Sequence, residues 1–161
     1  MKYNRIILFT AIAILAFASG CGGGVTNPME QLNNGVLIAD FPNGTGYNSA
    51  SAHVINQSSS YYISSTQDVS GQPADEINLT IPIPLNFNLP YTVTASDGVD
   101  IVYYDAMTSN NYEANAAQGS CSVTVTQVSP TVEGYFTATV ICSSISDNTR
   151  VLSGGQFNAT F

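Results

Sequence analysis

Apolar and polar residues alternate along much of this chain with a period of two, the pattern of a β-strand with one buried face. The pattern is clearest in three segments, whose apolar positions are Ile77, Leu79 and Ile81, then Tyr91, Val93 and Ala95, and finally Phe157, Ala159 and Phe161. Further strands are expected near residues 35–41, 50–56, 60–66, 100–105 and 111–117. We find no segment with a convincing helical period.

Glycine and proline mark the boundaries between these strands. Turns are expected at Asn43-Gly44, Gly71-Gln72-Pro73, Asp97-Gly98 and Gly154-Gly155. The segment 82–90 contains three prolines, which lack the N–H that a central strand donates, so we expect a loop or an irregular edge there. Eight to ten short strands in residues 35–161 predict one all-β domain, a single antiparallel β-sandwich or a partly closed barrel.

The segment 119–142 predicts a hairpin with its turn at 130–133. If Ser129 lies opposite Gly134, then Cys121 lies opposite Cys142, and the apolar residues between them share one face of the hairpin. Exported proteins favour disulfides, so the sequence predicts a Cys121–Cys142 bond, which contributes about 3 kcal/mol in the chain-entropy model. A metal or redox pair is the alternative, but twenty residues separate the two cysteines and no C-x-x-C is present.

The amino terminus has the three parts of an export signal in the required order. Lys2 and Arg5 are followed by an uncharged apolar run over residues 6–18, which is too short to span a membrane and suits a signal-peptide core. Small residues then precede Cys21, and the Ala-Ser-Gly-Cys of residues 18–21 resembles the bacterial lipobox. The resemblance implies a lipoprotein signal peptide over 1–20 and a diacylglycerol, with its palmitate-type acyl chains, on Cys21.

Other interpretations of this terminus stay open. The segment 16–18 also fits the A-x-A site of ordinary secretory cleavage, Cys21 could be a disulfide partner, and Ala18 stands where the lipobox usually has Leu. Against these, three glycines follow Cys21, and a flexible tether over 21–34 suits an anchored domain. A Cys121–Cys142 bond would also leave Cys21 as the odd cysteine. By the family rule, Gly22 in place of Asp favours the outer membrane.

The composition of the chain after Cys21 excludes several partners. Arg150 is its only basic residue against eleven acids, a net charge near −10. Nucleic acids and anionic lipid surfaces are bound through clusters of Lys and Arg, so neither is expected as a partner. The expected contacts are the membrane, through the lipid, and an envelope protein or glycan.

Candidate catalytic and metal-binding residues are few. His53 is the only histidine, and no G-x-S-x-G elbow accompanies it, so we expect neither an enzyme nor a zinc site. Asp97, Asp100 and Asp105 have the chemistry of calcium ligands, but Asp97-Gly98 is first a turn signal and the spacing matches no EF-hand. No cofactor is expected.

Adjacent tyrosines are the remaining candidates for ligand contact. In each of the pairs Tyr61-Tyr62 and Tyr103-Tyr104, one ring should face the core and the other should face outward. An outward tyrosine ring is a good contact for a sugar or a protein, although sheets also carry tyrosine for cross-strand packing alone.

The second half of the chain contains three segments that carry a family resemblance. They are Gly119–Thr126 (GSCSVTVT), 134–139 (GYFTAT) and the closing 154–161 (GGQFNATF), the last two with a G-x-F strand. Over about residues 75–161 these resemble a group of bacterial cell-envelope lipoproteins with a β-sandwich domain of unassigned function. The resemblance implies lipid anchoring and an all-β fold, and supplies no catalytic residues.

These observations lead to one main functional hypothesis. We expect a lipid-anchored cell-envelope lipoprotein whose β-sandwich is a non-enzymatic binding or structural module. The alternative is a surface adhesin or glycan-capture domain that uses exposed tyrosines, and a hydrolase with an unrecognised site is the weaker third possibility.

Overall fold

The computed structural model describes residues 32–68, 74–145 and 148–161, and it confirms an all-β domain. Its eleven strands are β1 (Val36–Asp40), β2 (Gly46–Ser49), β3 (His53–Asn56), β4 (Ser60–Gln67), β5 (Asp75–Pro82), β6 (Tyr91–Thr94), β7 (Asp100–Asp105), β8 (Asn110–Ala114), β9 (Ser120–Gln127), β10 (Thr131–Ile141) and β11 (Thr149–Thr160). A 3₁₀ turn, η1 (Ala95–Asp97), is the only helical element in these ranges, and none of their residues forms a helix that could span a membrane. The predicted export signal and most of the predicted tether lie outside the described residues.

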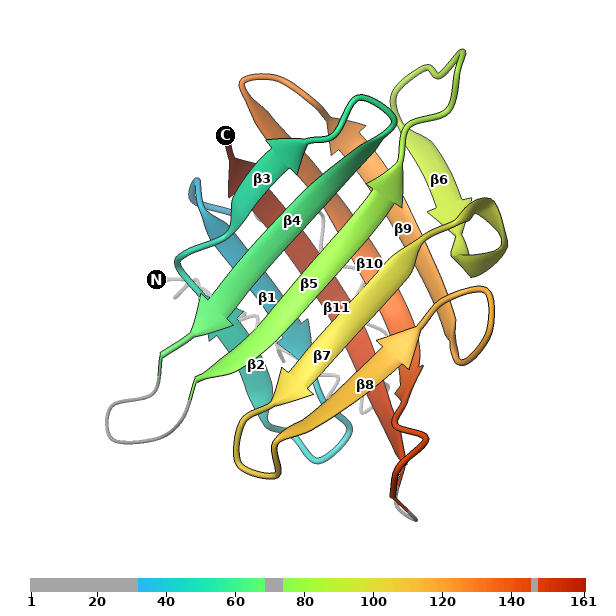
Figure 1. Cartoon of the computed structure of the whole chain (residues 1–161). Helices are drawn as coiled ribbons and strands as arrows, with labels where there is room; N and C mark the ends of the chain where they lie inside the picture. Colours follow the sequence, from blue (N-terminus) through green and yellow to red (C-terminus); the bar gives the residue numbers. More distant parts are fainter. Residues whose placement is uncertain (1–31, 69–73, 146–147) are drawn as a thin grey trace, which may run out of the picture. The chain divides into compact units, whose positions relative to one another are not determined.

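The strands form two layers that cross each other (Figure 1). One layer has the order β3-β4-β5-β7-β8 and the other β2-β1-β11-β10-β9-β6, with antiparallel neighbours throughout. At one corner Thr160 of β11 pairs with His53 of β3 in parallel, and at the other Ile141 of β10 pairs with Glu113 of β8. The domain is therefore a β-sandwich closed at two corners into a flattened barrel, as the strand pattern predicts.

Burial follows the predicted alternation. Ile77, Leu79 and Ile81 of β5 are fully buried, and Phe157 and Ala159 of β11 are buried in the same core, although Phe161 beyond them is exposed. These side chains fill the space between the layers, where burying apolar area is the main source of stability. The sequence therefore predicts which face of each strand packs inward.

The two G-x-F segments pair with each other across β10 and β11. Gly134 lies opposite Phe157, and Gly155 lies opposite Phe136, so each glycine faces the ring of the other motif. A Cβ at Gly155 would lie 2.7 Å from three carbons of the Phe136 ring, and one at Gly134 would lie 2.6 Å from Cζ of Phe157. The prediction of a turn at Gly154-Gly155 is wrong, because Gly155 is needed inside β11 to admit the ring.

The register of the β9–β10 hairpin differs from the prediction by four residues over most of its length. Phe136 lies opposite Val123, where the expected partner is Gln127, and Cys121 lies opposite Ala138. The cause is the early start of β10: Thr131 and Val132 already pair with β11 and are buried, so the turn comes before them. Because the register shift of four residues is even, the same side chains of β9 and β10 still face inward, although their partners on the opposite strand change.

The predicted Cys121–Cys142 disulfide is wrong in this structure, since both cysteines are free and buried. Cys142 lies four residues beyond the partner of Cys121, about 13 Å along the strand, and a disulfide requires Cα atoms within about 7 Å. The Cys121 thiol instead lies 3.6 Å from the carbonyl oxygen of Ala114, and the Cys142 sulfur lies 3.1 Å from Oγ of Ser144. The argument that Cys21 is the odd cysteine therefore no longer holds.

The structure also tests the predicted loop at 82–90 and the predicted strand at 50–56. The proline-rich segment after β5 is a loop over 83–90, as predicted. The expected strand at 50–56 is shorter, because β2 ends at Ser49 and β3 begins at His53.

The unpredicted β2 lies at the edge of its layer, and its Tyr47 side chain reaches across to β4 of the other layer. There the Tyr47 hydroxyl donates to Oγ of Ser65 at 2.9 Å.

Candidate ligand-binding cleft

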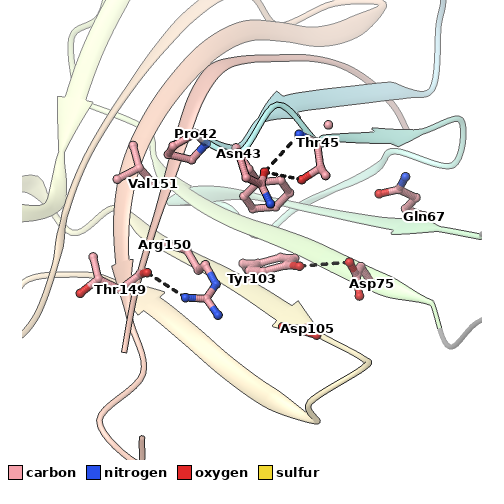
Figure 2. Close-up of a pocket in the computed structure, with 12 residues that line it drawn as sticks. Pro42, Asn43, Thr45, Gln67, Asp75, Tyr103, Asp105, Thr149, Arg150 and Val151 are labelled. Carbon is pink, nitrogen blue, oxygen red and sulfur yellow. Dashed lines mark hydrogen bonds between the residues drawn. The ribbon is translucent and has the colours of Figure 1, made fainter. Parts of the chain in front are cut away.

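An open cavity of about 650 Å³ lies at one end of the sandwich, where several strands begin or end. Its walls come from both layers, and Figure 2 draws the residues that line it. They are Phe41, Pro42, Asn43 and Thr45 of the β1–β2 turn, then Gly46 of β2, Gln67 of β4, Asp75 of β5, Tyr103 and Asp105 of β7, and Thr149, Arg150 and Val151 of β11. We call this cavity the cleft.

The β1–β2 turn that forms one wall is fixed by its own hydrogen bonds. Oδ1 of Asn43 accepts from the backbone N–H of Thr45 at 3.1 Å and from its hydroxyl at 2.7 Å. The backbone N–H of Phe41 donates to the Thr45 carbonyl at 2.9 Å, and Gly44 takes the positive φ of 79° that the turn requires. The Asn43-Gly44 signal therefore gives a turn that holds Phe41 at the cleft.

Aromatic rings form the inner part of the cleft. The Phe41 ring lies 5.2 Å from that of Tyr103, which stacks on Tyr112 at 5.8 Å. The guanidinium carbon of Arg150 lies 4.8 Å from the centre of the Tyr112 ring, within the range of a cation–π interaction. Arg150 also donates from Nη1 to the carbonyl of Thr149 at 3.1 Å. We call the three rings of Phe41, Tyr103 and Tyr112 the aromatic row. The only basic side chain after Cys21 is thus held against the Tyr112 ring of this row.

Asp75 is oriented in the cleft by two hydrogen bonds. Its Oδ2 accepts the hydroxyl of Tyr103 at 3.0 Å, shown as a dashed line in Figure 2, and its Oδ1 accepts the backbone N–H of Ala106 at 2.9 Å. Burial, followed by the charge of Asp75, raises the pKa of Tyr103 well above its usual range, so this hydroxyl keeps its proton and remains a donor. One oriented carboxylate therefore lies beside the aromatic row.

Most of the side chains that line the cleft are polar. They combine carboxylates, amides, hydroxyls and one guanidinium with the ring faces of Phe41 and Tyr103. Together these groups can donate and accept hydrogen bonds. The cleft can therefore orient a polar ligand through hydrogen bonds.

The four predicted tyrosines do not form one surface. Tyr103 lines the cleft and Tyr61 is buried in the core, whereas Tyr62 and Tyr104 are half-buried on the outer face of their layer, as alternation predicts. Tyr62 lies level with Thr80 of β5 and Tyr104 with Glu76, about 13 Å further along that strand. The inward–outward prediction is confirmed, but the outward rings make no continuous platform.

The remaining candidates lie apart from one another. His53 is exposed and pairs with Thr160 at one end of β11, whereas the cleft lies at the other end, around Thr149. Asp97 accepts from the N–H of Thr94 at 2.9 Å and so caps η1, which lowers the pKa of its carboxyl. Asp100 and Asp105 lie at opposite ends of β7, about 16 Å apart. The three aspartates therefore do not surround one cation.

Sequence reasoning missed most of the cleft. Phe41, Gln67 and Arg150 come from segments far apart in the sequence, and only the sandwich brings them together. Arg150 did carry a signal, because a lone cation in so acidic a chain stands out. Asp75 carries no signal in the sequence beyond its acidic neighbour Glu76, which does not line the cleft.

Comparisons of this chain with protein-family models, with curated proteins and with solved structures found no match.

Proposed function

We propose that this chain is a lipid-anchored lipoprotein of the bacterial cell envelope, and that its β-sandwich is a non-enzymatic binding module. The observation that carries the binding role is the cleft of about 650 Å³ with its oriented carboxylate. Small-molecule sites have this size range and typically contain a few well-placed polar groups. The lipobox-like residues 18–21 support the anchor.

The position of the cleft suits a domain tethered by its amino terminus. The described chain enters the sandwich beside the carboxyl end of β11, where the N–H of Gly35 donates to the carbonyl of Asn158 at 2.7 Å. The cleft includes Thr149 at the start of the same strand, about 30 Å away at 3.3 Å per residue. Entry and cleft thus lie at opposite ends of β11.

The length of the tether keeps the domain close to the membrane. The fourteen residues of the predicted tether, 21–34, span at most about 50 Å when fully extended. A single acyl chain binds a membrane only reversibly, so stable anchoring requires the additional chains that a lipidated amino-terminal cysteine carries. The proposal therefore depends on modification of Cys21 itself.

Metabolic labelling with radioactive palmitate tests this proposal in cells that express the full chain. We expect label on the wild type and its recovery with the membrane fraction, whereas Cys21→Ala should be unlabelled and released after secretory cleavage. The matched controls are Cys121→Ala and Cys142→Ala, which should keep the label because both thiols lie in the folded domain. A wild-type protein that takes up no label and fractionates as a soluble protein would overturn the proposal.

The choice of membrane has its own test. Gly22 follows Cys21, so in a cell with two membranes we propose the outer one. Density-gradient separation should place the wild type with outer-membrane markers and Gly22→Asp with inner-membrane markers. Recovery of both variants in the inner membrane would contradict this assignment while leaving the lipid anchor intact.

A further inference from the structure

We propose that the cleft binds a neutral saccharide, one or more sugar rings of an uncharged envelope or surface glycan. This inference rests on the proposed binding function and names the class of ligand.

The cleft contains both hydrogen-bond donors and hydrogen-bond acceptors. Asp75 and Asp105 supply acceptor oxygens, Arg150 supplies a guanidinium, and the side chains of Asn43 and Gln67 supply amides. A sugar hydroxyl both donates and accepts, so vicinal hydroxyls match paired carboxylate, amide and guanidinium groups. An apolar ligand would bury these groups without partners, at a cost of several kcal/mol in total.

Two of these groups have capacity left for a ligand. The carboxylate of Asp75 accepts one hydrogen bond on each oxygen from the protein, and a carboxylate offers about four acceptor positions. No hydrogen bond joins the Gln67 amide to another described residue, and its side chain is half-buried at the cleft. Because Asp75 is already oriented by Tyr103 and Ala106, a hydroxyl that binds it incurs little ordering cost.

The Phe41 ring supplies the apolar contact that a sugar ring requires. It is partly exposed at the cleft and packs on Tyr103 at a centroid distance of 5.2 Å. Its backbone is held by the Asn43–Thr45 turn. The C–H face of a pyranose can pack on such a ring while its hydroxyls reach the surrounding polar groups.

Charge separates neutral sugars from acidic ones. The two carboxylates in the cleft, and a net charge near −10 on the chain after Cys21, repel a polyanion such as an acidic polysaccharide. An uncharged, hydroxyl-rich ligand does not meet this repulsion.

The test uses the full mature lipoprotein in detergent micelles, first on an array of neutral and acidic oligosaccharides and then by calorimetric titration of the best neutral one. Maltose, cellobiose, chitobiose and mannobiose are the neutral probes at up to millimolar concentration, and oligogalacturonate is the acidic probe. We expect binding of at least one neutral glycan and none of oligogalacturonate. No neutral binding on the array or among the probes, or binding of the acidic probe alone, would overturn the saccharide proposal.

Substitutions locate the binding in the cleft. Gln67→Ala and Phe41→Leu should each weaken the Kd by about tenfold or more, the scale for loss of one good ligand contact. The matched control is Gln156→Ala, a half-buried glutamine of β11 that does not line the cleft, and it should bind like the wild type. Unfolding midpoints near that of the wild type identify the variants that are folded.

If a neutral glycan binds equally well to all folded variants, its site lies elsewhere and the inference is wrong. The palmitate experiment is independent of this one. A labelled, membrane-bound protein that binds no sugar would contradict the saccharide inference while leaving the anchor of the proposed function in place.

Discussion

The reciprocal glycine–phenylalanine pairs of β10 and β11 predict that Gly155→Ala is strongly destabilising. The new Cβ would lie 2.7 Å from three carbons of the Phe136 ring, whereas carbon atoms in contact lie about 3.5–4.0 Å apart. The ring, which is 1% exposed, must therefore move by about 1 Å in a close-packed core. Overpacking of this kind costs about 1–3 kcal/mol, and we expect the upper part of that range.

Urea unfolding of the wild type and Gly155→Ala measures this loss directly, and a second substitution identifies its cause. Phe136→Leu removes the ring atoms that the new Cβ would meet. The double variant Gly155→Ala/Phe136→Leu should therefore be more stable than the sum of the two single losses predicts, by at least about 1 kcal/mol. Gly46→Ala is the control, because its Cβ would have no neighbour closer than 3.7 Å and should change stability by less than about 0.5 kcal/mol.

Two results would refute this reasoning. The first is a Gly155→Ala variant as stable as the wild type, which would mean that Phe136 does not occupy the space above the glycine. The second is strict additivity with Phe136→Leu, which would show that the loss arises elsewhere in β11.

Three further predictions concern the core. Burial raises the pKa of Tyr47 and Tyr91 to about 12 and that of the Cys121 thiol to about 11. The ordinary pKa is 10.0 for tyrosine and 9.0 for cysteine, and the folded protein buries all three groups in their neutral forms. Their contribution to stability is therefore complete below the ordinary pKa values and is lost as the pH rises through the raised pKa values. Urea midpoints should therefore be flat from pH 7 to 9 and fall by pH 11, and a midpoint that rises with pH would contradict this. Unreduced protein should show two slowly reacting thiols, Cys121 and Cys142, which both react promptly with a thiol reagent in urea, whereas none would be found if they formed a disulfide. Ser65→Ala should cost about 1–3 kcal/mol because it removes a partner of the buried Tyr47 hydroxyl, and Tyr47→Phe about 1 kcal/mol because Ser65 still donates to the Ile77 carbonyl; equal losses in urea unfolding would argue against this network.

The sequence predicts the faces of the strands better than their partners. Ile77, Leu79 and Ile81 are buried as expected, because period-two alternation is a local property of one strand. The register of the β9–β10 hairpin depends on more than the hairpin itself. Thr131 and Val132 pair with β11, far along the chain, and this pairing moves the turn and separates Cys121 from Cys142. A local pattern contains no information about that third strand.

The cleft shows the same division between local and long-range information. The Asn43-Gly44 turn that holds Phe41 is a local signal and was predicted. Which side chains face that turn is decided by the closure of the sandwich, which places Asp75, Tyr103 and Arg150 around it from three separate strands. Adjacent tyrosines drew attention to Tyr103, but its role as the donor that orients Asp75 required the fold.

The proposed lipid on Cys21, which would anchor a binding domain at the cell envelope, can be detected by its mass. The measurement is mass spectrometry of the amino-terminal peptide of the mature protein, purified from its own membranes. We expect a peptide that begins at Cys21 and whose mass exceeds that of the bare sequence by a diacylglycerol, with or without a further acyl chain. An unmodified peptide that begins at Ser19, after ordinary cleavage behind Ala18, would contradict it.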